Sequence, residues 1–285
     1  MPDILEMVEC PRDAMQGWKT NIPTEKKIQY INALLKVGFH TLDMGSFVSA
    51  KLIPQMADTA EVLEGLQYEN SATKLLTIVA NTRGAEQASK YNNIAYIGFP
   101  FSVSPSFQMR NTNSSMEESL VRVREIVSIC KTSGKQPVVY MSMGFGNPYG
   151  DVYSVDILKE WMDKIAGLGV DIISIADTVG LAEPEQVSGV VGSMIPLFPE
   201  ITVGVHLHSR AENIVSKLKA AFNAGCRRFD GAINGIGGCP MADDELVGNM
   251  DTIVMVRYFQ EKGFVPNLDM KALEECRKIA LEIFN

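Results

Sequence analysis

The chain has 285 residues, of which 46% are hydrophobic and 21% are charged, so it can bury a large core. A formal net charge of -8 argues against a nucleic-acid-binding surface, and an anionic ligand would need locally clustered basic residues. Because the N-terminus lacks a basic and an apolar segment and no long apolar run follows, we expect a cytoplasmic protein with neither a signal peptide nor a membrane span.

Short β-rich runs alternate with segments of helical periodicity along the chain. They start near Ile4, Phe39, Lys74, Ile94, Gln136, Val170, Ile201 and Arg227. Eight such units suit a closed (β/α)8 TIM barrel, whereas an open doubly wound sheet would have fewer strands. Since no Pro/Ser-rich linker interrupts the pattern, we expect a single α/β domain over residues 1–285.

Local signals place helices between these strands. An apolar stripe over residues 28–35 ends before Gly38, a plausible residue for a helix C-terminus. Residues 115–118, Ser-Met-Glu-Glu, form a capping-box pattern, and Pro184 fits the first turn of a helix that reaches about Leu197.

Polar residues of functional type follow the predicted strands. The active site of a barrel of this kind lies at the C-terminal ends of its strands. The residues found there are Arg12, Asp13, Asp43, Asn81, Ser142, Asp177, His206, His208 and Asn234. Taken singly, such charges have simpler interpretations as surface ion pairs or helix N-caps. In a closed barrel, however, three carboxylates would crowd together without compensation unless they served a metal site.

The pair His206 and His208 is the most informative motif for a metal. Residues i and i+2 of a strand share a face, so both imidazoles could bind one ion. The alternative is two hydrogen-bonded histidines on a half-buried strand. With Asp13 and Asn249 as candidate oxygen ligands, the mixed donors suit Mg2+ or Mn2+, and Zn2+, Co2+ or Fe2+ are also compatible. His40 lies near the start of the second strand, at the opposite end.

A glycine-rich segment over residues 235–238 precedes Cys239. Such a loop can move as a lid and bring the thiol to the site, although a glycine-rich turn with an incidental cysteine is an equal alternative. The scattered, odd set of cysteines favours reduced thiols over disulfides. The others, interpreted as core or helix residues, are Cys10, Cys130, Cys226 and Cys276.

Together these motifs resemble the 3-hydroxy-3-methylglutaryl-CoA lyase family, within a wider group of metal-dependent lyases and condensing enzymes on (β/α)8 barrels. The resemblance covers almost the whole chain, and the glycine-cysteine loop is its most discriminating part. The segments that carry it are residues 11–13, 46–49, 54–56, 104–111, 117–119, 148–149, 177–180, 205–208, 237–240 and 248–249.

The resemblance implies cleavage of 3-hydroxy-3-methylglutaryl-CoA to acetyl-CoA and acetoacetate. It implies a divalent metal bound by Asp13, His206, His208 and Asn249. It implies catalytic roles for Arg12, Asp43, Asp177, Cys239 and His206. Arg12 would stabilise the enolate oxygen, and Asp43, Asp177 and Cys239 would take part in proton transfer. The base that deprotonates the substrate hydroxyl is left open between Asp43 and Asp13.

The chain has no diphosphate-binding motif for coenzyme A. Candidate anchors near the barrel mouth are Lys51, Asn81, Arg110 and Asn111, although backbone donors at helix N-termini would leave no side-chain signature. The expected partner is an acyl-CoA substrate, with neither nucleic acid nor membrane. The assembly state stays open, with a homodimer as one option.

Several positions depart from the family pattern. The family usually has Gly where this chain has Cys10 and Ala14, and Glu where it has Asp43. An Asp-Thr pair usually stands where this chain has Ser209 and Arg210. These departures keep two alternatives open. One is a related hydroxy-acid aldolase or a condensing enzyme similar to 2-isopropylmalate or homocitrate synthase. The other is a non-catalytic barrel that binds a metal or an acyl-CoA.

Overall fold

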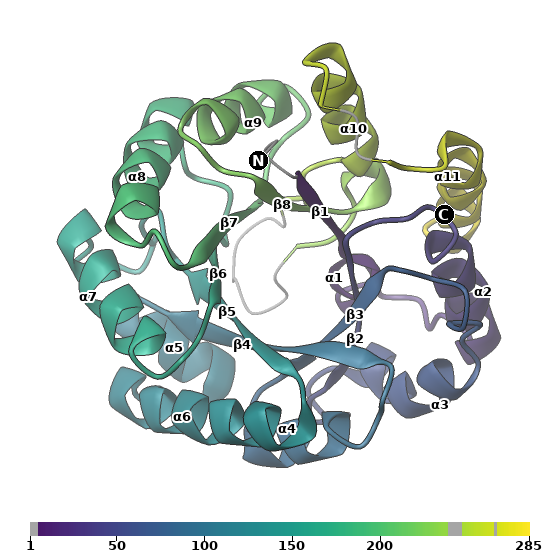
Figure 1. Ribbon diagram of the computed structural model, residues 1–285, viewed down its shortest axis with the longest axis horizontal. Helices are drawn as coiled ribbons and strands as arrows, with labels where there is room; N and C mark the ends of the chain where they lie inside the picture. The colour runs from purple at the N-terminus through teal and green to yellow at the C-terminus, as the bar shows by residue number, and fades with distance from the viewer. Residues whose placement is uncertain (1–4, 239–246, 265–266) are drawn as a thin grey trace.

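The computed structural model describes residues 5–238, 247–264 and 267–285. Within them, eight parallel strands close into a barrel in chain order, and β8 pairs with β1. The strands are β1 (Glu6–Glu9), β2 (Thr41–Phe47), β3 (Lys74–Val79), β4 (Ile94–Ser102), β5 (Gln136–Ser142), β6 (Ile172–Asp177), β7 (Thr202–Leu207) and β8 (Arg228–Gly231). Figure 1 looks along the barrel, which the helices surround. The predicted (β/α)8 barrel is confirmed.

The helices of the described residues connect the strands or follow the last one. They are α1 (Pro11–Gln16), α2 (Thr24–Leu34), α3 (Thr59–Glu64), α4 (Thr82–Ala88), α5 (Pro105–Thr112), α6 (Met116–Ser133), α7 (Val155–Ala166), α8 (Pro184–Leu197), α9 (Ile214–Asn223), α10 (Thr252–Glu261) and α11 (Met270–Ile283), with short 3-10 turns η1 (Pro54–Met56) and η2 (Ile233–Gly235). In Figure 1, α10 and α11 complete the helical ring between α9 and α2.

The local predictions agree closely with these elements. Strands β3, β4 and β5 start at the predicted residues, and the others start one or two residues later. The helix predicted from Pro184 to about Leu197 is α8. The Ser115 side chain accepts from the Glu118 backbone N–H while the Glu118 carboxylate accepts from the Ser115 N–H, so the capping box is confirmed.

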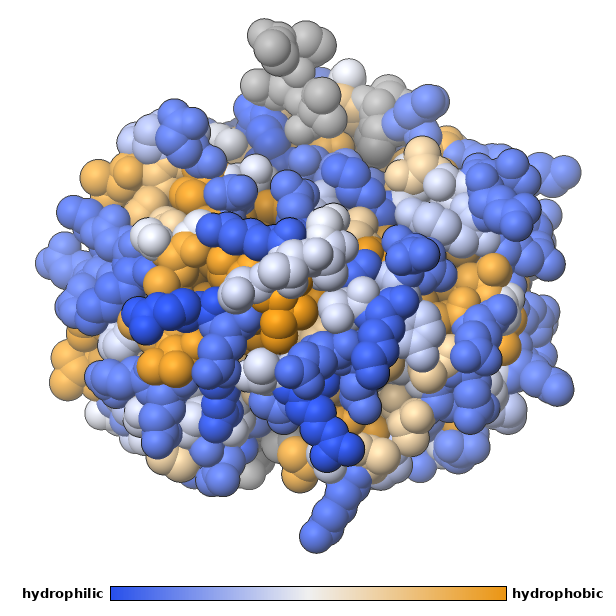
Figure 2. Space-filling model, turned by 60° about the horizontal axis from the view of Figure 1, so that its bottom comes forward, coloured by the Kyte–Doolittle hydropathy of each residue, from blue (hydrophilic) through white to orange (hydrophobic). Residues whose placement is uncertain are grey.

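Two apolar clusters hold the barrel. The larger one fills the space between the strands and the helices, as expected for parallel strands covered by crossover helices. The smaller one comprises Leu76, Ile78, Tyr96, Val138, Tyr140 and Ile172. On the face in Figure 2, hydrophilic residues are spread widely and hydrophobic residues form patches between them. No helix in the described part of the chain is both long and apolar enough to cross a membrane.

Glu9 is a buried carboxyl group on β1 that joins the first strand to the last segment of the barrel. It accepts hydrogen bonds from the Ile233 backbone N–H at 2.9 Å and from the Thr252 hydroxyl at 2.5 Å. Burial raises the pKa of Glu9 to about 8, although both hydrogen bonds oppose that rise. The native state therefore binds the Glu9 proton more tightly than the unfolded state does.

We expect Glu9→Gln to remove a pH dependence of stability. Between about pH 4.5 and 8 the unfolded chain releases the Glu9 proton while the native chain keeps it, so the free energy of unfolding falls as pH rises, by up to about 1.4 kcal/mol per pH unit. Urea unfolding of both proteins at pH 5, 6, 7 and 8 measures this. The stability of the wild type should fall relative to Glu9→Gln, whereas a constant difference would contradict the expectation.

Candidate active site

The first turn of α1 carries Arg12 and Asp13 to the mouth of the barrel. Strand β1 ends at Glu9, and Pro11 starts the helix directly after it, a position where the missing N–H of proline costs nothing. The side chains of Arg12 and Asp13 are only 10% and 6% exposed, and both residues line a pocket. The short connection therefore directs a cation and a carboxylate into the site, as predicted.

His206 lies near the end of β7, and His208 directly follows that strand. Their ring centroids lie 5.0 Å apart, and both residues are buried. The potential ligand atoms of Asp13, His206 and His208 all lie within 4.8 Å of one another. The structure thus brings together these three predicted metal ligands, which come from α1, from β7 and from the residue directly after β7.

Hydrogen bonds orient both imidazoles toward the shared space. Nδ1 of His206 faces Oδ2 of Asp230 at 3.2 Å, and Nδ1 of His208 faces the backbone oxygen of Val247 at 3.0 Å. An imidazole that donates from Nδ1 has its lone pair on Nε2. Two such nitrogens beside a carboxylate fit a divalent cation.

Asp13 accepts hydrogen bonds at both oxygens. Oδ1 accepts from Arg12 Nη1 at 3.0 Å and from Gln16 Nε2 at 2.6 Å, and Oδ2 accepts from Asn249 Nδ2 at 2.7 Å. Burial alone would raise the pKa of Asp13, but Arg12 and the nearby histidines outweigh it and lower that pKa to about 2. The carboxylate is therefore ionised at neutral pH and can serve as an anionic ligand.

After β8 the chain folds back toward β7, and this places Asn249 beside His208. Asn249 and His208 form an antiparallel bridge, and the Ser209 N–H donates to the Gly248 oxygen at 2.9 Å. The amide nitrogen of Asn249 donates to Asp13 and to the Ile236 oxygen. A ligand role needs the amide oxygen on the side of Asp13, so this role stays a prediction.

Gly237 shows how closely the segment after β8 packs against Asn249 and α1. Its φ of +115° is one that L side chains rarely adopt, and a Cβ there would lie 2.4 Å from Asn249 Nδ2 and 2.9 Å from the Asp13 backbone oxygen. Only glycine fits such a position. The glycine-rich segment singled out in the sequence thus has a structural reason at this residue. Cys239, which follows it, lies outside the described residues.

Asp43 lies at the inner side of Arg12. Its two oxygens accept from Arg12 Nε at 3.2 and 3.1 Å and from Nη2 at 2.5 Å, and its side chain has no exposed surface. Burial raises the pKa of Asp43, and Arg12 opposes the rise. For Arg12, burial would lower the pKa, but Asp43 and Asp13 raise it. Arg12 is thus a permanently charged group fixed between two carboxylates.

Asp177 has different surroundings from those the sequence suggested. Its chain neighbours Ala176, on β6, and Thr178, directly after β6, line the pocket. The Asp177 carboxylate instead accepts from Lys217 Nζ at 2.8 Å and from the Ala182 N–H at 3.2 Å. Lys217 Nζ also donates to the backbone oxygens of His208 and Gly180. This buried pair ties β6 to the loop of the second histidine.

Replacing Lys217 by Met should destabilise the protein by roughly 3–5 kcal/mol, because a buried Asp177 carboxylate would lose its counter-charge. The double variant with Asp177→Asn should regain much of the loss, since the buried charge is then removed as well. Chemical denaturation of the three proteins measures both effects. A cost below about 1 kcal/mol for Lys217→Met would show that solvent compensates the carboxylate.

The pocket combines this polar group with an apolar wall. Its apolar lining includes Val48, Leu52, Ile53, Ile78 and Phe107. Such a mixture of convergent polar groups and apolar surface is typical of small-molecule sites.

The four predicted anchors for coenzyme A have separate environments. Asn111 lines the pocket. The Asn81 side chain caps α4 by accepting from the Gly84 N–H at 3.0 Å. Arg110 lies over the ring of Tyr149, 4.5 Å from its centroid, and Lys51 is exposed. Only Asn111 among them lines the described pocket.

The residues that depart from the family pattern after the histidines are also placed. Ser209 is buried, and its hydroxyl donates to the Arg210 backbone oxygen at 3.2 Å. Arg210 is exposed and is not part of the pocket lining formed by the described residues.

Two residues of this region were not singled out in the sequence. Asp230 follows Arg228 by two positions in β8, so strand alternation could have put both on one face. Lys217 lies on the same face of α9 as Ile214, Leu218 and Ala221, all buried. A lysine on an apolar helical face was the available signal.

Comparisons with known proteins agree with this geometry. The HMGL-like family model matches residues 7–279. The cytoplasmic 3-hydroxy-3-methylglutaryl-CoA lyase of Mus musculus is 30% identical over 289 residues, covering 100% of this chain and 82% of that protein. The (R)-citramalyl-CoA lyase of Chloroflexus aurantiacus is 27% identical, covering 93% and 86%. The structure of an HMG-CoA lyase from Acinetobacter baumannii in complex with coenzyme A and 3-methylmalate is 31% identical, with a TM-score of 0.91 and coverage of 99% and 92%.

Proposed function

The chain belongs to the HMGL-like family, and from this premise we propose that it is a metal-dependent carbon–carbon lyase. Its substrate is 3-hydroxy-3-methylglutaryl-CoA, and its products are acetyl-CoA and acetoacetate. The observation that carries the proposal is the convergence of Asp13, His206 and His208 within 4.8 Å of one another, in a pocket that Arg12 also lines. Relatives of about 30% identity are named for this activity.

The proposed cofactor is Mg2+ or Mn2+, with Zn2+, Co2+ and Fe2+ as compatible alternatives. Asp13, His206 and His208 would hold it, and Asn249 is the proposed fourth ligand. A bound divalent cation would polarise the substrate oxygens and ease loss of the C3 hydroxyl proton. The oxygen acceptors beside Nδ1 of both histidines and the lowered pKa of Asp13 support this assignment.

Arg12 is the group that we propose for enolate stabilisation. When the C2–C3 bond breaks, its electron pair passes to C2 and is delocalised onto the thioester oxygen. A guanidinium held by two carboxylates donates to that oxygen without having to reorganise. Protonation of C2 then gives acetyl-CoA, and the former C3 alkoxide becomes the ketone of acetoacetate.

Asp43 is well placed to hold Arg12. Its carboxylate is fully buried and occupied by Arg12, so we propose a positioning role for it. The acceptor of the hydroxyl proton remains open between Asp43 and Asp13. Proton-transfer roles for Asp177 and Cys239 and a catalytic role for His206 also remain proposals.

The proposal also covers the binding partner, the cellular location, the domain organisation and the assembly of the protein. The partner is an acyl-CoA substrate, which the pocket residue Asn111 would help to bind, while Lys51, Asn81 and Arg110 remain candidate anchors. We place the protein in the cytoplasm, where the Mus musculus relative is named as located. We also propose that residues 1–285 form one catalytic domain. A homodimer is the candidate assembly.

A comparison of turnover on three substrates tests this function. The full chain, supplied with Mn2+, is given 3-hydroxy-3-methylglutaryl-CoA, citramalyl-CoA and a CoA-free hydroxy-keto acid in parallel, and loss of each substrate is followed. We expect the first substrate to give the highest kcat/KM. Rapid turnover of the CoA-free acid alone would favour an aldolase, and no turnover of any hydroxyacyl-CoA would favour a non-catalytic binding protein.

A further inference from the structure

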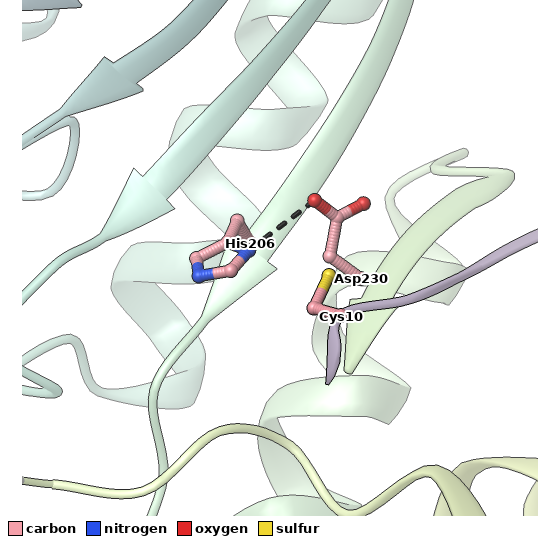
Figure 3. Close-up of side chains that lie close together, drawn as sticks. All are labelled: Cys10, His206 and Asp230. Atoms are coloured by element: carbon pink, nitrogen blue, oxygen red, sulfur yellow. Dashed lines mark hydrogen bonds and ion pairs between the residues drawn. The ribbon is translucent and has the colours of Figure 1, made fainter. Parts of the chain in front are cut away.

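His206 makes a contact on the side of its ring that faces away from Asp13. Asp230 is its register partner on the neighbouring strand β8, and Oδ2 of Asp230 lies 3.2 Å from Nδ1 of His206. The Asp230 side chain has no exposed surface. Figure 3 shows this carboxylate directed at the imidazole, with Cys10 beside the pair. The contact is therefore a buried side-chain pair within the barrel wall.

From this geometry we propose that Asp230 is the positioning residue of the metal centre. Its carboxylate accepts the Nδ1–H of His206 and so fixes both the ring orientation and the tautomer that leaves Nε2 free toward Asp13 and His208. A carboxylate acceptor also makes the imidazole a stronger donor to a cation. The inference rests on the proposed metal-dependent function and assigns a residue outside its ligand set.

The two histidines differ in how they are held. The Nδ1 of His208 faces the backbone oxygen of Val247, which is neutral and which no side-chain substitution removes. Asp230 offers His206 an ionisable acceptor, and charge-assisted hydrogen bonds are the stronger kind. Of the two histidines, His206 is therefore the one whose orientation depends on a side chain.

Among the described residues, His206 is the side chain to which the Asp230 carboxylate is hydrogen-bonded. Its second oxygen, Oδ1, is buried without a hydrogen-bond partner among the described residues, so His206 is the side chain it bonds directly. The nearby thiol of Cys10 does not compete for Nδ1, because its contact is with the Val8 backbone oxygen at 3.9 Å.

A buried cation, Arg228, lies on the same strand as Asp230, and its Nη1 pairs with Oε2 of Glu6 at 2.7 Å. Arg228 precedes Asp230 by two residues, and its side chain is 1% exposed. Burial would lower the pKa of Arg228, but the neighbouring Asp230 and Tyr140 raise it. Gly204 provides the space, since a Cβ there would lie 3.1 Å from Cγ and Cδ of Arg228.

Mn2+ binding to the metal-free full-length protein, without substrate, tests the proposal. We expect Asp230→Asn to weaken the Kd measured by calorimetry about 10- to 100-fold. Asp171→Asn is the matched control, because it removes one carboxylate from an exposed position just before β6, and it should leave the Kd unchanged. A wild-type Kd in Asp230→Asn would overturn the inference and leave the proposed function intact, whereas absence of Mn2+ binding by the wild type would overturn both.

A second measurement reads the tautomer directly, and its decisive observation is made on the wild-type protein. The chain has three histidines, so 15N NMR of histidine-labelled protein gives few signals, and His40→Asn identifies one of them. In the neutral ring of His206 we expect the proton on Nδ1 in the wild type and a mixture of tautomers in Asp230→Asn. A wild-type His206 protonated on Nε2 would overturn the proposal.

Discussion

Replacing Arg12 by Lys should lower kcat about 10²- to 10³-fold, the loss typical for removal of one preorganised oxyanion donor. The guanidinium contacts Asp43 through Nε and Nη2 and Asp13 through Nη1. A lysine ammonium keeps the charge but has no planar fork, so it cannot bond both carboxylates in this way and still face the pocket.

Steady-state kinetics and Mn2+ calorimetry on Arg12→Lys separate the two roles of this residue. Loss of enolate stabilisation lowers kcat, while the Kd for Mn2+ should change little because Lys keeps a positive charge near Asp13. Asp43→Asn provides a comparison, since it loosens the guanidinium without removing it and should cost less. A kcat within about threefold of the wild type in Arg12→Lys would remove Arg12 from the chemistry.

Replacing His208 by Ala should abolish both metal binding and turnover. This change removes a direct ligand, so the loss of metal affinity should exceed the roughly 10- to 100-fold caused by losing an outer partner. The proposed reaction depends on the cation, and its rate should therefore fall toward that of metal-free protein.

His40→Ala is the matched control for the His208 variant. His40 lies just before β2, and its Nε2 is 3.4 Å from Glu6 at the opposite end of the barrel. Metal content and turnover of His40→Ala should equal those of the wild type. If His208→Ala kept its metal and its kcat, the histidine pair would not be the metal centre.

The sequence was sufficient to predict the barrel and the end at which the candidate site residues gather. Alternating strand and helix signals and the polar residues after β1, β2 and β7 gave the arrangement that the structure confirms. The predicted gathering of Arg12, Asp13, Asp43, His206 and His208 follows from strand order alone, because parallel strands in a closed barrel end at one mouth.

The direction of each side chain was harder to predict. β6 is buried on both faces, so its pattern of apolar residues did not tell which of Ala176 and Asp177 faces inward. The pairing of Asp177 with Lys217 spans 40 residues, and no local signal joins them. Asn249 likewise reaches its place only through the backbone bridge to His208.

The roles predicted for Cys239 and for the coenzyme A anchors stay predictions. The roles of Cys239 and of the coenzyme A anchors depend on contacts with substrate, and Cys239 lies outside the described residues. Asp43 stands where the family usually has Glu, and in this chain it reaches Arg12 with both oxygens. The shorter side chain is thus accommodated by the guanidinium.

The most direct test of the account is cation dependence of substrate cleavage. The full chain is treated with a chelator and dialysed, and release of acetyl-CoA from 3-hydroxy-3-methylglutaryl-CoA is measured before and after addition of Mg2+ or Mn2+. We expect negligible release without the cation and full turnover after its addition. Undiminished turnover by metal-free protein, or none in the presence of either cation, would contradict it.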